Sequence, residues 1–351
     1  MQHFDLTQLY WNGLIREQLL GQGLDRLPHA MLLVGPTGVG KTAFSEQLAA
    51  LLLCESVAPD LTACGECQAC RWLDAGNHPD FRRVAPDGDD ETDEGAPEKT
   101  AEKTKKRSPG IISIARIREL EAFVFTGSHR NGSRVVLITE AEAMPPAAAN
   151  ALLKILEEPP ASVYFILVSS KTKSLLPTIR SRCRVILFAA PDAAAATAWL
   201  AGAGLEKQAA RYLQLAGGAP MRVAQWKDQG QLAPLDALVD SLISPPADPM
   251  ALAARWDGLL KGDGVFRMEN LVEGVQRWLF DLAQERMAGE IRYHGGWPRP
   301  KGVENLSPTG LMTAWREIGQ FRRSARHPLN QLLFLENMAT HFLRALRPAA
   351  S

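Results

Sequence analysis

The segment Gly35-Pro36-Thr37-Gly38-Val39-Gly40-Lys41-Thr42 fits the phosphate-binding loop pattern G-x-x-x-x-G-K-[ST]. An apolar run at 31–34 precedes it, as expected of a buried parallel strand, and residues 43–53 follow with helical spacing. Glycines in such a loop let backbone N–H groups surround a phosphate, and the helix N-terminus adds positive potential. Lys41 would then reach the β- and γ-phosphates of ATP, and the Thr42 hydroxyl would ligate Mg²⁺. The segment therefore predicts an α/β domain with a nucleotide site, or a loop that keeps this shape without its nucleotide.

Size and composition describe a globular chain of more than one domain. The chain has 351 residues, of which 46% are hydrophobic and 22% are charged, and a single core rarely extends over that length. It has no apolar run of membrane-spanning length, and its N-terminus lacks the basic start and apolar core of a signal peptide. These features predict a cytoplasmic protein with no membrane partner. The formal net charge of +0 argues against a protein that wraps nucleic acid unaided.

Four of the five cysteines, Cys54, Cys64, Cys67 and Cys70, lie close together in the sequence. They combine two overlapping C-x-x-C steps with an upstream cysteine. In a reducing compartment such clustering indicates a metal site before disulfides. Four thiolates suit tetrahedral Zn²⁺ in a closed structural site; a redox pair or free thiols are the alternatives. His78 either competes as a ligand or is a loop residue that makes a capping hydrogen bond.

Residues 87–110 contain no large apolar side chain, and acidic residues fill the first half while basic residues fill the second. Such a segment cannot bury enough surface to order itself. We therefore predict a mobile insert between a strand at 81–84 and a helix near 114–124. Its basic half is a candidate for touching DNA, but the acidic half would partly cancel that charge, which favours a solvated loop.

A second buried strand is predicted at 134–140, and it ends in Thr139-Glu140. In phosphate-loop ATPases this strand normally ends in Asp-Glu, where the Asp holds Mg²⁺ and the Glu positions the attacking water. A neutral hydroxyl at Thr139 is a poor substitute for a carboxylate beside a hard divalent cation. We therefore expect weak Mg²⁺ retention and weak or absent hydrolysis. Glu140 stays a candidate catalytic residue, and nucleotide binding through 38–42 can survive.

The rest of this domain continues the alternation of helix and strand. A helix is expected from 147 to two prolines at 159–160, then strands at 163–168 and 185–188. Ser169 and Ser170 follow the first of these strands, where a hydroxyl either senses a γ-phosphate or caps the strand. Before the second strand lie three arginines in five residues, a solvated basic turn by composition, and Cys183, which we expect in the core.

Past Pro191 the pattern becomes helical. Alanine-rich helices are expected at 192–202, 205–216 and 219–228, and further helices fill 231–347 around a loop at 293–300. Their apolar stripes are typical of a bundle core or an oligomer collar and carry no chemistry by themselves.

Five features occur together in this order: the loop at 35–42, the four-cysteine segment at 54–70, His78-Pro79-Asp80, the run at 150–160, and Ser181-Arg182-Cys183. Together they resemble the bacterial clamp-loader AAA+ family, which comprises the tau/gamma ATPases and the delta-prime subunits of DNA polymerase III. The resemblance is most specific over 30–188 and weakest over the C-terminal helices. It implies a RecA-like AAA+ domain at 1–189 that contains a zinc module at 54–80, then a helical lid at 190–230 and a helical collar at 231–351.

The resemblance also implies roles for single residues and for the whole chain. Arg182 matches the arginine finger offered in trans to the ATP of a neighbouring subunit, and Arg222 lies in the place resembling sensor 2, which would touch a nucleotide in cis. The four clustered cysteines match the family zinc ligands. By resemblance the chain joins tau/gamma ATPase subunits and delta in a five-membered ring. That ring opens the sliding clamp and places it on primed DNA, and this chain does not itself polymerise DNA.

Thr139 and the chain length resemble the delta-prime branch rather than the longer tau subunits. The intact loop at 35–42 departs from the eroded nucleotide sites of many delta-prime subunits, which leaves ATP binding open. One alternative is an active ATPase of the tau/gamma type, which would hydrolyse ATP alone. Another is a nucleotide-independent zinc scaffold of the same complex, in which Lys41→Ala would be silent. An unrelated kinase would need an acceptor-substrate site, and none is evident in the sequence.

Overall fold

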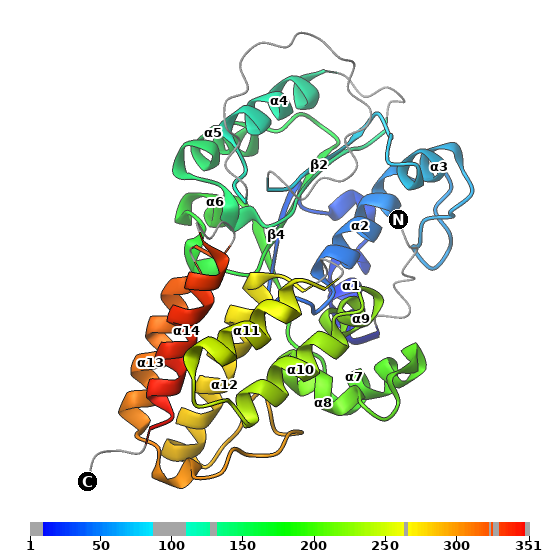
Figure 1. Cartoon of the computed structure of the whole chain (residues 1–351). Coiled ribbons are helices and arrows are strands. Elements are labelled where there is room, and N and C mark those ends of the chain that lie inside the picture. Colours follow the sequence, from blue (N-terminus) through cyan, green and yellow to red (C-terminus); the bar gives the residue numbers. More distant parts are fainter. Residues whose placement is uncertain are drawn as a thin grey trace. The chain divides into compact units, whose positions relative to one another are not determined.

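The chain folds into two compact units, Met1–Pro191 and Asp192–Ser351. The computed structural model describes residues 10–86, 110–126, 132–262, 266–322, 324–325 and 330–347. Over these residues the first unit is α/β and the second is built of helices (Figure 1). The predicted insert at 87–110 lies outside the described residues except for Gly110.

A five-stranded parallel sheet forms the centre of the first unit. In the order of neighbours its strands are β2 (Phe81–Val84), β3 (Arg134–Ile138), β4 (Val163–Ser169), β1 (Ala30–Val34) and β5 (Arg184–Leu187). β1 and β3 are buried at every position, which explains why their sequences are apolar runs rather than alternating patterns. The carboxyl ends of β3, β4 and β1 meet at one edge, where ligands bind in open parallel sheets.

Helices cover both faces of this sheet (Figure 1). The helices of the unit are α1 (Gly13–Leu20), α2 (Lys41–Leu53), α3 (Gln68–Asp74), α4 (Ile114–Phe125), α5 (Pro146–Glu157) and α6 (Pro177–Arg182). On one face Leu152 of α5 and Ile179 of α6 share a core with Leu32 of β1 and Phe165 of β4. α2 packs on the other face, toward which Met31 and Leu33 of β1 point, because side chains alternate along each strand.

The described part of the second unit consists of helices and short turns. These helices are α7 (Ala193–Leu200), a π-helical turn (Ala201–Leu205), α8 (Ala209–Leu215), α9 (Pro220–Asp228), α10 (Leu232–Ile243), α11 (Pro249–Leu260), α12 (Met268–Ala288), α13 (Pro308–Phe321) and α14 (Gln331–Ala345). α12 packs along α13, and α11 packs along α14. No helix among the described residues is long and apolar enough to cross a bilayer.

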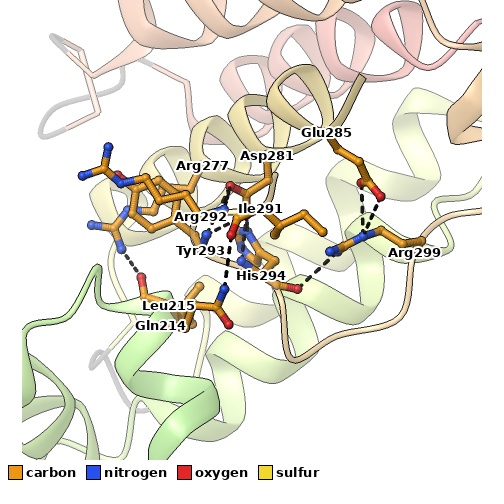
Figure 2. A network of polar contacts seen from close by, with 10 residues as sticks. All are labelled: Gln214, Leu215, Arg277, Asp281, Glu285, Ile291, Arg292, Tyr293, His294 and Arg299. Carbon is orange, nitrogen blue, oxygen red and sulfur yellow. Dashed lines mark hydrogen bonds and ion pairs between the residues drawn. The ribbon is translucent and has the colours of Figure 1, made fainter. Parts of the chain in front are cut away.

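One buried carboxylate organises the loop that follows α12 (Figure 2). Asp281 is 2% exposed and accepts hydrogen bonds from the backbone N–H groups of Arg292, Tyr293 and His294 at 2.7–3.2 Å. The Nδ1 atom of the buried His294 ring lies 2.8 Å from the same carboxylate. A buried carboxylate is tolerated when hydrogen bonds replace its hydration, so Asp281 holds the loop in one conformation.

Two predicted boundaries differ from the structure for backbone reasons. The strand predicted at 134–140 ends at Ile138, because Glu140 adopts a left-handed conformation with φ +49° and begins a 3₁₀ turn. The helix predicted from 205 begins at Ala209, because Gly204, with φ +83°, interrupts the preceding helical path and residues 206–208 form a turn. The other predicted strands are found within one residue of their expected ends. The domain boundaries at 189 and 230 stay predictions.

Candidate functional site

The phosphate loop connects β1 to α2 in the conformation that its glycines allow. Gly38 and Gly40 have φ of +83° and +97°, and α2 begins directly after Gly40. At Gly35 a Cβ atom would lie 2.1 Å from the carbonyl oxygen of Phe188, so only glycine fits there. Trp11 donates from Nε1 to the Val39 carbonyl at 3.1 Å and so braces the loop from outside. The loop therefore has the shape expected of a phosphate cradle.

Lys41 is the buried cation of this loop, with 4% of its surface exposed. Its ammonium donates to the carbonyl oxygens of Gly35 and Pro36 at 2.8 and 2.6 Å and to Ser170 Oγ at 3.2 Å. Burial lowers the pKa of Lys41 to about 8, although attraction to Glu142 opposes the shift. The Thr42 side chain next to it is exposed. A partly desolvated ammonium and an exposed hydroxyl at the start of a helix suit a phosphate with its cation.

The carboxyl end of β3 places a neutral side chain where phosphate-loop ATPases carry an acid. Thr139 is buried, and both its backbone N–H and its hydroxyl donate to the carbonyl oxygen of Val84 in β2, at 2.9 and 3.4 Å. The hydroxyl is thus already engaged by the sheet. Glu140 is exposed. This arrangement leaves no carboxylate at position 139 to hold a divalent cation.

A second acidic residue, Glu142, reaches the end of the neighbouring strand. Its Oε1 atom accepts a hydrogen bond from the backbone N–H of Ser170 at 3.1 Å, and its Oε2 atom is buried without a hydrogen-bond partner among the described residues. The sequence analysis missed Glu142. Its position two residues after Glu140, at the same strand end, was the available signal.

The four clustered cysteines come together beside α2 and α3. Their Sγ atoms all lie within 4.8 Å of one another, with pairs at 3.5 Å (Cys54–Cys64) and 4.0 Å (Cys54–Cys67 and Cys64–Cys70). A tetrahedral ion with metal–sulfur bonds of about 2.3 Å requires sulfur–sulfur distances of about 3.8 Å.

Backbone geometry and the neighbouring histidine support the same reading of this cluster. The backbone N–H groups of Cys64, Cys67 and Cys70 donate to cluster sulfurs at 3.3–3.4 Å. Such bonds favour thiolates. His78 is not among the residues whose ligand atoms come together in this cluster, and its Nδ1 accepts from the backbone N–H of Asp80 at 3.1 Å, which is the capping alternative. The residues therefore fit a thiolate-bound metal ion.

We predict that the purified chain carries one tightly bound Zn²⁺. Cys67→Ser should bring the metal content below about a tenth of an equivalent, because a hydroxyl is a poor zinc ligand. Cys183→Ala is the matched control: Cys183 is buried outside the cluster, and burial raises its pKa to about 11, so this variant should keep its zinc. Elemental analysis of the chain after gel filtration gives the answer, and a wild-type chain without metal would rule the site out.

Arg182 lies at the last position of α6, on the surface of the first unit. The buried residues Ile179 and Cys183 anchor this helix end in the core, so Arg182 projects from it. Its guanidinium forms an ion pair with Glu157 at the end of α5 and donates to the Thr178 carbonyl at 3.2 Å. Its side chain keeps 34% of its surface exposed. Sequence reasoning did not anticipate Glu157 as the partner of Arg182.

Arg222 is engaged within the second unit. Its guanidinium forms an ion pair with Glu273 of α12 and lies 5.0 Å from the centre of the Trp226 ring. Arg277 contacts the same carboxylate at 2.7 Å. Burial raises the pKa of Glu273, but Arg277 and Arg222 outweigh it and leave the pKa below its usual value. The predicted contact of Arg222 with a nucleotide stays a prediction.

Comparison with known proteins gives one family. Residues 19–192 match the family model described as DNA polymerase III, delta subunit. The DNA polymerase III subunit delta' of Pseudomonas aeruginosa is 37% identical over 255 residues, which cover 71% of each chain. That of Escherichia coli is 33% identical over 194 residues, 55% of this chain and 52% of the relative. The DNA polymerase III subunit tau of Salmonella typhimurium is 34% identical over 163 residues, 46% of this chain and 22% of that protein.

The matched region thus spans 71% of the Pseudomonas relative but about half of the length of the Escherichia relative. Identity of 37% over more than two thirds of both chains is enough to establish common descent and a common fold. The chain belongs to the family of DNA polymerase III delta' subunits.

Proposed function

We propose that this chain is a clamp-loader component that helps load the sliding clamp onto primed DNA during replication. In this proposal it supplies Arg182 in trans to the ATP of a neighbouring tau/gamma-type ATPase subunit. The observation that carries it is the placement of Arg182: a partly exposed guanidinium at the end of α6, next to the buried Cys183, in a chain of the delta' family. A cation delivered to a γ-phosphate stabilises the charge that develops during hydrolysis.

The chain's own phosphate loop would bind a nucleotide without splitting it efficiently. Lys41 and the loop backbone are arranged as a cradle for a phosphate. Thr139 supplies no carboxylate, and its hydroxyl donates to the Val84 carbonyl. When bound with ATP, Mg²⁺ would supply charge neutralisation, with Thr42 as the residue to ligate it. The chain would thus complete a neighbour's ATP site while hydrolysing little ATP at its own.

Assembly tests this function. The full chain should copurify with tau/gamma and delta subunits as one complex, and omission of the chain should abolish loading of the sliding clamp onto primed DNA. The readout is the amount of clamp retained on a primed circular template. Loading at an undiminished rate without this chain would contradict the proposal. The zinc module is expected to be structural, so it should be retained in the complex.

The burial of Lys41 predicts a pH dependence of nucleotide binding. Its pKa lies near 8 in the empty loop, and a bound phosphate, being anionic, raises it. Binding therefore takes up a proton once the pH exceeds about 8, and affinity should fall as the pH rises from 8 towards the pKa of the bound state. Titration of ADP into the full chain at pH 7, 8 and 9 should show an affinity that is flat at first and then falls by up to about tenfold per pH unit. An affinity that rises across this range would contradict the assignment.

The second candidate is an active ATPase of the tau/gamma type. The intact loop and the 34% identity to a tau subunit favour it. It predicts steady ATP turnover by the isolated chain, with Glu140 positioning the water. The neutral side chain at Thr139 argues against this candidate.

A further inference from the structure

An acidic side chain borders the phosphate loop and bears on its choice of ligand. We propose that Glu142 determines the nucleotide preference of this loop, because its carboxylate borders the place of a γ-phosphate and makes the loop favour nucleoside diphosphates over triphosphates. This inference rests on the proposed retention of nucleotide binding by the chain's own loop.

Contacts link Glu142 to the loop through one residue. Glu142 lies in the 3₁₀ turn Ala141–Ala143 after β3, and its Oε1 atom holds the backbone N–H of Ser170 at the end of β4. The hydroxyl of Ser170 in turn accepts from the Lys41 ammonium at 3.2 Å. Three groups from the ends of β3 and β4 and the start of α2 thus surround one small region.

This region would lie beside the terminal phosphate of a bound nucleoside triphosphate. In phosphate-loop proteins the loop lysine contacts the β- and γ-phosphates. Groups that adjoin the ammonium on the side of the strand ends therefore adjoin the terminal phosphate of a triphosphate. Glu142 is such a group, since it accepts from the backbone N–H of Ser170, whose hydroxyl contacts the Lys41 ammonium. One of its oxygens, Oε2, is shielded from water without a hydrogen-bond partner among the described residues.

The charges then favour the shorter ligand. A shielded carboxylate repels an approaching γ-phosphate and competes with it for the Lys41 ammonium, because like charges a few ångströms apart interact strongly away from water. A diphosphate ends one phosphate earlier and avoids the closest approach. A cation could offset this repulsion, but Thr139 replaces the carboxylate that would hold one firmly.

Calorimetric titration of the full zinc-bound chain tests the proposal, with ADP and the non-hydrolysable analogue AMP-PNP as probes in Mg²⁺. Wild type should bind ADP at least about tenfold more tightly than the analogue. Glu142→Gln keeps an oxygen for the Ser170 N–H and removes the charge. It should strengthen binding of the analogue about tenfold while ADP affinity stays within about twofold. Glu121→Gln, at an exposed position of α4, is the matched control and should behave as wild type.

The other outcomes separate this inference from the function on which it rests. If Glu142→Gln leaves the ratio of the two affinities unchanged, or weakens analogue binding as loss of a cation ligand would, the role of Glu142 is overturned while nucleotide binding stands. If no variant binds either nucleotide at millimolar concentration, retention of nucleotide binding fails and the inference fails with it. The role of Arg182 at a neighbouring site is untouched by that result.

Discussion

Replacement of Arg182 by alanine is expected to lower ATP hydrolysis at the neighbouring subunit's site by about 10³-fold or more, the range in which arginine fingers act. The chain itself should fold and assemble normally, because Arg182 is about one third exposed and its polar partners among the described residues are the exposed Glu157 carboxylate and the Thr178 carbonyl. An exposed ion pair of this kind contributes about 1 kcal/mol or less to stability. The measurement is single-turnover hydrolysis by the reconstituted complex on primed DNA, where the burst from one site should disappear.

Two variants control this experiment. Arg182→Lys keeps the charge but loses the planar fork that can bind two phosphate oxygens, so it should restore hydrolysis only in part. Arg180→Ala removes an exposed arginine of the same helix α6 and should leave the burst unchanged. Full hydrolysis by the Arg182→Ala complex, at wild-type levels of assembly, would contradict the assignment of Arg182 as an arginine finger.

Replacement of Asp281 by alanine is expected to destabilise the second unit by about 3–5 kcal/mol. The substitution leaves the backbone N–H groups of Arg292, Tyr293 and His294 without their acceptor in a buried place (Figure 2). It also removes the partner of the His294 ring. Burial lowers the pKa of His294, and Asp281 opposes that shift. A cost of this size is a large part of the stability of an ordinary domain.

Tryptophan fluorescence during urea unfolding of the full chain measures this cost, because six of the eight tryptophans lie in the second unit: Trp199, Trp226, Trp256, Trp278, Trp297 and Trp315. Asp240→Ala removes an exposed carboxylate from α10 and should change stability by no more than about 0.5 kcal/mol. A loss below about 1 kcal/mol in Asp281→Ala would mean that water replaces the carboxylate and that the loop is not organised by it.

Local patterns in the sequence were enough to predict most helices and strands of the first unit. Buried parallel strands are apolar runs, so the strands at 31–34 and 163–168 could be predicted without knowing their partners. The loop at 35–42 and the cysteine cluster could also be predicted, because the residues of each motif lie close together in the sequence. The order of the strands was not predicted, since neighbours in a parallel sheet are distant in the chain.

Contacts between distant residues account for what sequence reasoning missed. The role of Glu142 could not be predicted, because it depends on β3 and β4 placing Glu142 beside Ser170, which is 28 positions away. Glu157 meets Arg182 across 25 positions, and Arg222 meets Glu273 across 51. Charged residues of this kind look like solvated surface positions in a sequence, because nothing local to them distinguishes a partner from solvent.

The central claim is that this chain completes a neighbour's ATP site while hydrolysing little ATP itself. The most direct measurement compares steady-state ATP turnover by the full chain alone, by the neighbouring tau/gamma-type ATPase alone, and by the assembled complex on primed DNA. We expect ATP turnover at the level of the blank for the lone chain, and turnover in the complex well above that of the ATPase alone. Rapid turnover by the lone chain, abolished by Lys41→Ala, would contradict it.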